Sequence, residues 1–290
     1  MGGTEAGVWV SLRLAVRAWE IERRMRIGLV QSAPVFGGVE RNRRRLLDLM
    51  GSARADLYVL PELCLSGYVF AETKEVEALS EPADGPSAQQ FVEFARKTGS
   101  FVVFGFAERS THLYNSAALV GPDGLVGVYR KVHLFDRERL FFAPGDRGFP
   151  VFDLPFGRVG MMICFDWIFP ESARSLALRG AQLIAHPSNL VLPHCPDAMV
   201  TRCLENRVFA ATADRVGREL HAGRSLTFIG TSEVVSPSGE ILTRMSRDEE
   251  GVALCDVDPA AALQKQVTPM SDVFEGRRPD QYTLGRPDIG

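Results

Sequence analysis

The 290-residue sequence lacks the features that mark several large classes of protein. No stretch approaches the roughly 18 consecutive apolar residues that a membrane-spanning helix needs. The formal net charge of −3 provides no electrostatic attraction for nucleic acid or for an anionic membrane. With 46% hydrophobic and 24% charged residues, the composition is that of a folded domain rather than a disordered chain. We therefore expect a globular protein whose partners include neither nucleic acid nor a membrane.

Cysteine and histidine are scarce and show no metal-binding spacing. The five cysteines contain no CxxC pair, and the five histidines contain no HxxxH pair. An odd number of unpaired cysteines is typical of a reducing compartment, so we expect a cytoplasmic protein. Walker A, GxGxxG and GxSxG motifs are also missing from the sequence, so nucleotide binding and serine hydrolysis have no support. We expect neither a metal nor an organic cofactor.

Lysine is the rarest cation, since only four of the 33 Lys and Arg residues are Lys. One of the four, Lys131, directly follows the apolar run LVGVYR. An ammonium is a compact point charge whose pKa shifts readily on burial, unlike a guanidinium. A lysine at this position in an arginine-rich chain is therefore a candidate functional residue.

Apolar runs alternate with helical patterns from Met25 onward, and we interpret residues 1–24 as an extension outside the core fold. The expected helices cover 39–50, 87–98, 170–179 and 197–212. The expected strands cover 27–31, 56–62, 100–108, 114–122, 125–131, 151–155, 158–164, 181–187, 228–237, 240–245 and 251–257. Hairpin turns at 123–124, 156–157 and 237–239 argue against an all-parallel sheet. We expect one α/β domain over residues 25–258, followed by a C-terminal tail at 259–290.

Three of the expected strands end in a reactive side chain, namely Glu62, Lys131 and Cys164. Each alone has an ordinary structural explanation: a turn residue, a solvated charge and a small buried apolar residue. Ligands in layered α/β folds bind beyond the carboxyl ends of strands, so together the three could form a reaction centre. The sharp turn after Cys164 would expose the thiol and point backbone N–H groups toward it, and a nearby cation would stabilise the thiolate.

Three longer motifs contain these residues: PELCLSGY (61–68), YRKVHLF (129–135) and ICFDWIFPES (163–172). With FFAPGD, HPSNLVLP, LENRVF and ADRVG further along, the chain resembles the nitrilase or carbon–nitrogen hydrolase superfamily. The resemblance is strongest to the short nitrilase-like hydrolases of hyperthermophilic archaea. It implies a four-layer α-β-β-α sandwich that pairs through its central helices and C-terminal tail, so we expect a homodimer or a higher homo-oligomer.

The resemblance also implies roles for four residues. Glu62 would be the general base, Lys131 the cation at the developing oxyanion, and Cys164 the nucleophile. Glu138, in the long polar segment 132–150, matches a fourth polar residue that positions the substrate. The reaction would then be attack of the thiol on a C–N carbon, release of ammonia, and hydrolysis of the resulting thioester.

Four further residues lie in the matching motifs. The backbone N–H of Phe165 would join Lys131 in binding the oxyanion. Tyr68, Trp167 and Asn189 would line the substrate pocket. His133 and His186, also inside motifs, are expected to be structural hydrogen-bonding residues. Cys64 is expected to pack in the core, although a place in the pocket is the alternative.

The substrate class is left open by the residues. An amide would form the thioester directly, whereas a nitrile would first form a thioimidate, and the short chain favours an amidase. The alternatives are a nitrilase, an N-carbamoyl amide hydrolase, an acyltransferase with the same triad, and a non-catalytic interaction module. No cation follows Cys164 before Arg174, although Arg137 and Arg139 flank Glu138. We therefore expect a small neutral amide or nitrile rather than a substrate with a carboxylate.

Overall fold

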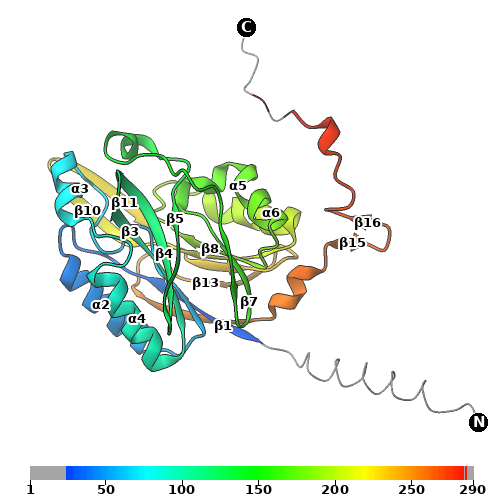
Figure 1. Cartoon of the computed structure of the whole chain (residues 1–290), viewed down its shortest axis with the longest axis horizontal. Coiled ribbons are helices and arrows are strands. Elements are labelled where there is room, and N and C mark those ends of the chain that lie inside the picture. The colour runs from blue at the N-terminus through cyan, green and yellow to red at the C-terminus, as the bar shows by residue number, and fades with distance from the viewer. Residues whose placement is uncertain (1–23, 284, 286–290) are drawn as a thin grey trace, which may run out of the picture.

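Two six-stranded sheets form the centre of the protein, described by a computed structural model for residues 24–283 and 285 (Figure 1). The expectation for residues 1–24 falls, apart from Arg24, outside the described residues. The first sheet has the order β14-β1-β2-β3-β4-β5. Its strands are β1 (Met25–Gln31), β2 (Leu57–Val59), β3 (Phe101–Arg109), β4 (Leu113–Gly121), β5 (Gly124–Arg130) and β14 (Gly251–Val257).

The second sheet has the order β13-β12-β9-β8-β7-β6. Its strands are β6 (Val151–Leu154), β7 (Gly157–Met161), β8 (Leu183–Pro187), β9 (Phe209–Ala213), β12 (Glu233–Val235) and β13 (Ile241–Arg244). Parallel pairing joins β1, β2 and β3 in one sheet and β7, β8 and β9 in the other. The three expected hairpins are β4–β5, β6–β7 and β12–β13, each antiparallel. Both sheets are therefore mixed, as the turn signals predicted.

Helices cover the outer face of each sheet. Helices α2 (Val39–Gly51) and α4 (Pro86–Thr98) lie on the first sheet, and α5 (Pro170–Leu178) and α6 (Cys195–Asn206) lie on the second (Figure 1). A shorter helix, α3 (Thr73–Leu79), lies at one end of the first sheet. The result is the four-layer α-β-β-α sandwich that the resemblance implied.

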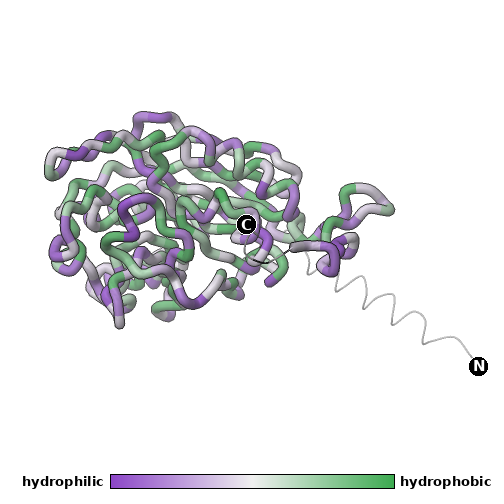
Figure 2. Tube along the Cα trace, turned by 90° about the horizontal axis from the view of Figure 1, so that it is seen from above, coloured by the Kyte–Doolittle hydropathy of each residue, from purple (hydrophilic) through white to green (hydrophobic). Residues whose placement is uncertain are grey.

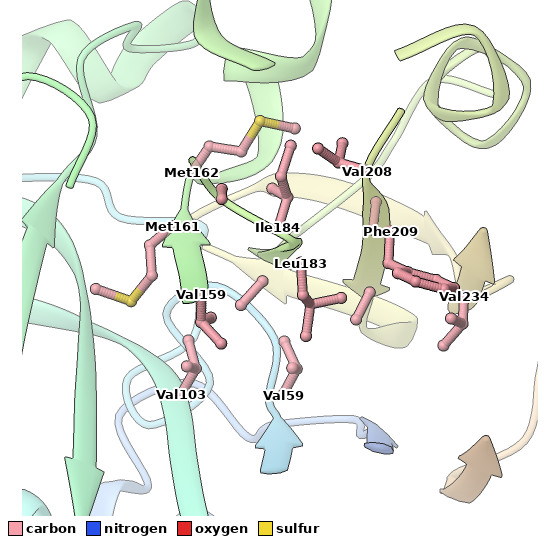
Figure 3. Packing of buried hydrophobic residues seen from close by; sticks show 14 of the residues in the cluster. Val59, Val103, Val159, Met161, Met162, Leu183, Ile184, Val208, Phe209 and Val234 are labelled. Atoms are coloured by element: carbon pink, nitrogen blue, oxygen red, sulfur yellow. The ribbon is translucent and has the colours of Figure 1, made fainter. Parts of the chain in front are cut away.

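The alternation of side chains along β2 explains the two layers of core. Leu57 and Val59 point to the space between the sheets, whereas Tyr58 and Leu60 pack under α2 and α4. All four side chains are buried, which is why this strand reads as a continuous apolar run. Figure 3 shows Val59 and its neighbours from the first sheet against Val159 and Leu183 of the second. Hydrophobic segments run through the interior of the layers in Figure 2 as well.

The expected helix over 197–212 is too long. Helix α6 ends at Asn206 because Arg207 adopts a left-handed conformation with φ of +50°. Residues 209–213 instead form β9, which pairs in parallel with β8. The expected strand over 228–237 is divided, since Gly230 and Thr231 take positive φ angles between β11 (Arg224–Ile229) and β12. Strand β11 pairs with β10 (Val216–His221) in a hairpin that the sequence analysis missed.

The C-terminal residues form short elements outside the two sheets. They are η3 (Pro259–Leu263), β15 (Gln266–Thr268), β16 (Ser271–Asp272) and η4 (Pro279–Gln281). Figure 1 shows this segment extending away from the sandwich. Among the described residues, no helix combines the length and the apolar composition that crossing a bilayer requires.

Candidate active site

Strand direction brings the first sheet's polar residues to a common edge. Strand β3 is parallel to β2 and antiparallel to β4, and β4 is antiparallel to β5. Strands β2 and β5 therefore point the same way, and their carboxyl ends deliver Glu62 and Lys131 to the same edge. Strand β4 runs the opposite way, so Asn115, near its start, lies at that edge too.

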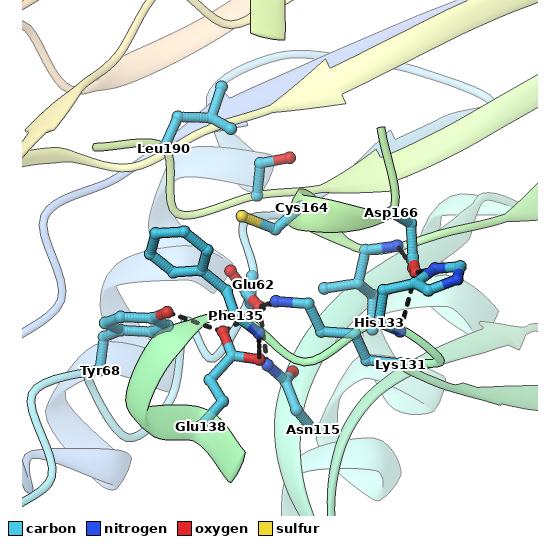
Figure 4. A network of polar contacts seen from close by, with 12 residues as sticks. Glu62, Tyr68, Asn115, Lys131, His133, Phe135, Glu138, Cys164, Asp166 and Leu190 are labelled. Atoms are coloured by element: carbon cyan, nitrogen blue, oxygen red, sulfur yellow. Dashed lines mark hydrogen bonds and ion pairs between the residues drawn. The ribbon is translucent and has the colours of Figure 1, made fainter. Parts of the chain in front are cut away.

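These residues form a buried polar network (Figure 4). The Lys131 Nζ donates to Glu62 Oε1 at 2.6 Å and to Glu138 Oε1 at 2.8 Å. Asn115 Nδ2 donates to the same Glu62 oxygen at 2.7 Å. The other oxygen, Glu62 Oε2, is buried and has no hydrogen-bond partner among the described residues. Glu62 thus keeps one oxygen bound in the network and one available to accept a proton.

Glu138 enters the network from the polar segment after β5. It lies in the single-turn helix η1 (Asp136–Leu140), and its Oε2 accepts the backbone N–H of Phe135 at 3.2 Å. Its Oε1 accepts the Tyr68 hydroxyl at 2.7 Å in addition to Lys131. Glu138 is buried rather than exposed on the surface. One ammonium therefore lies between two carboxylates.

Cys164 begins a tight turn that leads from β7 into η2 (Cys164–Ile168). Its φ of +42° is uncommon for a residue with a side chain, and comparable strain is frequent at functional sites. The carboxylate of Asp166 stabilises the turn by accepting the backbone N–H of Ile163 at 2.9 Å and the Tyr129 hydroxyl at 2.6 Å. Figure 4 shows the sulfur directed toward the side of the cavity where Glu62 and Lys131 lie.

Both histidines of the motifs hydrogen-bond to this turn. His133 Nδ1 lies 2.8 Å from Asp166 Oδ1, and His186 Nε2 lies 3.0 Å from the carbonyl oxygen of Cys164. Burial lowers the pKa of His186 to about 4, so that ring is neutral. Asp166 is therefore a buried residue that caps the turn.

Burial controls the ionisation of Glu62 and Lys131. It raises the pKa of Glu62 to about 7, although the positive charge of Lys131 opposes this rise. For Lys131, burial acts to lower the pKa, but the carboxylates of Glu138 and Glu62 outweigh it and raise the pKa above its ordinary value. Lys131 is therefore a permanent cation, and Glu62 can exchange a proton near neutral pH.

The thiol of Cys164 is neutral at rest, contrary to the expectation of an exposed, cation-stabilised thiolate. The residue is only 5% exposed. Burial raises its pKa well above the ordinary value, the negative charge of Glu62 adds to this, and Lys131 compensates only in part. Attack by the sulfur therefore requires a base that takes the proton during the reaction.

Cys164 opens into a cavity whose lining carries no charged side chain. The lining consists of Phe135, Cys164, Phe165, Trp167, Asn189, Leu190, Val191 and Leu192. Asn189 is 2% exposed, and neither polar atom of its side chain has a partner among the described residues. Phe165 is the second residue of η2, so its N–H is among the donors that a helix start leaves without an intrahelical acceptor.

Tyr68 lines a neighbouring cavity instead, separated from the first by Phe135. Arg137 also lines this second cavity, whereas Arg139 is exposed. Cys64 is fully buried in the core under the helices of the first sheet, where its thiol contacts the carbonyl oxygen of Gly105 at 3.3 Å. The expected residues that line the first cavity are Cys164, Phe165, Trp167 and Asn189. Tyr68 and Glu138 line the second, and Glu62 and Lys131 line neither.

The sequence analysis missed Asn115. Its signal was a polar residue at the start of an otherwise apolar strand, YNSAALVG, next to a tyrosine. The β4–β5 hairpin places the start of this strand where β5 ends, and the order of the strands in the sheet brings it to the end of β2 as well. Within residues 24–283 and 285, no cluster of His, Cys, Asp and Glu has the geometry to hold a metal ion.

Comparison with known proteins places the chain among hydrolases of C–N bonds. The family model for carbon–nitrogen hydrolase matches residues 26–265. A nitrilase from Pyrococcus abyssi is 46% identical over 263 residues, which are 89% of this chain and 99% of that protein. The crystal structure of a carbon–nitrogen hydrolase from Helicobacter pylori superposes with a TM-score of 0.83 at 26% identity, covering 90% of this chain and 97% of that one.

A mutant of the amidase from Nesterenkonia sp. AN1 is also similar, with a TM-score of 0.71 and 26% identity over 85% of this chain and 95% of that one. In that structure the acetamide moiety of fluoroacetamide is covalently attached to the active-site cysteine.

Proposed function

The chain belongs to the carbon–nitrogen hydrolase family, and on that premise we propose that it hydrolyses small neutral amides through a thioester on Cys164. The observation that carries the proposal is the Glu62–Lys131–Glu138 network, buried beside the cavity that contains the thiol. Burying charges carries a desolvation cost, which is offset here by the close pairing of Lys131 with both carboxylates. A base and a cation buried beside the cavity that contains the thiol support nucleophilic acyl transfer.

Acylation begins with proton transfer from the Cys164 thiol to the unpaired oxygen of Glu62 as sulfur attacks the carbonyl carbon. The C=O double bond opens, and its oxygen becomes an anion stabilised by Lys131 and the N–H of Phe165. Glu62 then returns the proton to the nitrogen, the C–N bond breaks, and ammonia leaves. The sulfur retains the acyl group as a thioester.

Deacylation repeats these steps with water as the nucleophile. Glu62 takes a proton from water, the oxygen attacks the thioester carbon, and the same donors stabilise the second oxyanion. The C–S bond breaks, and the proton passes from Glu62 to the sulfur. The products are a carboxylic acid and the regenerated thiol.

The cavity lining supports a neutral acyl group. Its aromatic and aliphatic walls provide no cation to pair with a carboxylate. Asn189 provides a buried carboxamide whose donor and acceptor are both unpaired, and it can bind the substrate's amide group. Glu138 and Asn115 keep Lys131 and Glu62 in place during both half-reactions.

Nitrile hydrolysis is the second candidate, because the 46% identical relative is described as a nitrilase. Sulfur would attack the nitrile carbon to give a thioimidate. Addition of water and loss of ammonia would then form the same thioester. The residues required are the same, but the unpaired donor and acceptor of Asn189 favour the amide, because a nitrile has no N–H group to donate.

The test is ammonia release from matched substrates: butyramide, butyronitrile and an N-carbamoyl amino acid of similar size. The proposal expects the highest kcat/KM for the amide, with the acid as product. Adding hydroxylamine separates hydrolysis from acyl transfer, because an acyltransferase would direct most of the thioester to hydroxamate. The proposal is wrong if butyramide releases no ammonia, and a higher kcat/KM for butyronitrile would favour the nitrilase instead.

A further inference from the structure

Two buried charged residues that the mechanism above does not use contact the segment that contains Tyr68. Arg215 is 1% exposed and Glu219 is 5% exposed, and they flank the start of β10. The Arg215 Nη1 lies 2.7 Å from Glu219 Oε2. Burying such a pair carries a large desolvation cost. The other hydrogen bonds of the two residues show which part of the structure the pair holds in place.

Glu219 uses both carboxylate oxygens. While Oε2 pairs with Arg215, Oε1 accepts the backbone N–H groups of Tyr68, at 2.9 Å, and of Val69. The preceding residue, Gly67, has a φ of +85°, and a Cβ there would come within 2.9 Å of Glu219 Oε2. Glycine therefore permits both the turn and the close approach of the carboxylate.

Arg215 also reaches the side chain of Tyr68 indirectly, because the ring of Phe228 packs against both residues. Its guanidinium lies 4.0 Å from the centroid of the Phe228 ring. The Tyr68 ring meets Phe228 edge to face at 6.0 Å between centroids. A hydrogen bond from Arg215 Nη2 to the Pro34 carbonyl oxygen, at 3.2 Å, fixes the guanidinium itself. The pair thus restrains the backbone and the ring of Tyr68.

The Tyr68 hydroxyl donates to Glu138 Oε1, the same oxygen that accepts from Lys131 (Figure 4). We propose that Arg215 and Glu219 are positioning residues that act on the reaction by holding the Tyr68 hydroxyl on Glu138. The effect on turnover rests on the proposed function, whereas the effect on the network can be measured without it.

The expected direction follows from charge. Glu62, Glu138 and Lys131 together carry a net negative charge, and a hydrogen bond donated to an anionic group stabilises its charged form. When the Tyr68 hydroxyl is removed or displaced, the anionic form of the network loses this stabilisation. Glu62 then keeps its proton up to a higher pH. Glu62 is then less able to accept the thiol proton at neutral pH.

The experiment is a double-mutant cycle between Tyr68→Phe and Glu219→Gln. A glutamine has nearly the same volume but only one acceptor, so it cannot satisfy Arg215 and the two backbone N–H groups together. The readout is the rate of Cys164 alkylation by iodoacetamide from pH 6 to 10, followed by mass spectrometry. In this reaction the sulfur displaces iodide and Glu62 takes the proton. Ammonia release from butyramide is measured in parallel.

Glu219→Gln is expected to slow Cys164 alkylation at pH 7 by about tenfold and to move its pH midpoint upward. In the Tyr68→Phe background, the same substitution should change the rate by no more than about twofold. Equal slowing in both backgrounds, or an unchanged midpoint, overturns the proposal.

Glu233→Gln is the matched control, since Glu233 is a buried carboxylate that pairs with Arg244 across β12 and β13 of the second sheet. An equal loss in this control also overturns the proposal, because the effect would then be general destabilisation. If Glu219→Gln does not fold, Gly67→Ala displaces the same turn without changing a charge, and the same outcomes apply. Failure of the proposed function would instead appear as no ammonia from the wild-type protein while the alkylation cycle keeps its coupling.

Discussion

Replacing Asn115 by leucine should change the pH dependence of the reaction. The Asn115 amide donates to Glu62 Oε1 at 2.7 Å inside a fully buried site. This bond favours the carboxylate form, whose pKa is already about 7 because of burial. Leucine is similar in size and cannot donate, and it also removes a buried Asn115 oxygen that has no partner among the described residues. The substitution should therefore affect ionisation more than folding.

The magnitude follows from the type of bond. A hydrogen bond to a charged group contributes about 1.5–3 kcal/mol, which corresponds to about 1 to 2 pH units. Because Glu62 must be ionised to accept the thiol proton, kcat/KM rises with pH on the acid side, with a midpoint of about 7 in the wild type. In the Asn115→Leu variant the midpoint should move up by this amount, so activity at pH 7 falls about 5- to 50-fold and recovers at higher pH.

The assay is ammonia release at low substrate concentration between pH 5.5 and 9.5. Ser116→Ala is the matched control, since Ser116 is the next residue of the same strand and donates to Glu108 at 2.7 Å instead of to Glu62. The control should keep the wild-type midpoint. A uniform loss for Asn115→Leu at every pH, with the midpoint still near its wild-type position, would refute the reasoning.

Three further outcomes follow. Lys131→Arg should lower kcat/KM by more than about tenfold, because the planar guanidinium cannot fill the compact ammonium site between two carboxylates; retention of most activity would count against a role at the oxyanion. Steady-state kinetics should give a higher kcat/KM for butyramide than for an N-carbamoyl amino acid, and the reverse order would mean that a cation such as Arg137 reaches the substrate. Removal of the C-terminal tail from residue 259 onward should reduce the dimer population that we propose, measured by light scattering, and an unchanged mass would exclude the tail from the interface.

Strand ends were the most informative part of the sequence. Glu62, Lys131 and Cys164 each follow an apolar run, and parallel strands that end together place such residues in one region. The expected hairpin at 123–124 already places Asn115 beside Lys131, whereas its approach to Glu62 depends on the order of the strands in the sheet, which no local signal gives. The ionisation state of Cys164 escaped prediction, since it depends on burial and on the charge of Glu62, and neither can be read from a motif.

The missed elements have a local cause. The segment FAATA fits a helix or a buried strand equally well, and only its pairing with β8 decides between them. The β10–β11 hairpin turns at Ala222 and Gly223, both with positive φ. Alanine is not typical of such a turn position, so the sequence did not indicate the hairpin. These errors did not affect the site, although the missed hairpin contains Glu219, which holds the backbone of Tyr68.

The central claim, a covalent acyl group on Cys164, is tested most directly by mass spectrometry of acid-quenched enzyme during butyramide turnover. The account predicts that a fraction of the protein gains the mass of one butyryl group, that the peptide containing Cys164 carries it, and that Cys164→Ala shows none. The other four cysteines are buried and serve as internal controls. Turnover with no adduct in rapid-quench samples, or an adduct on another residue, would contradict the account.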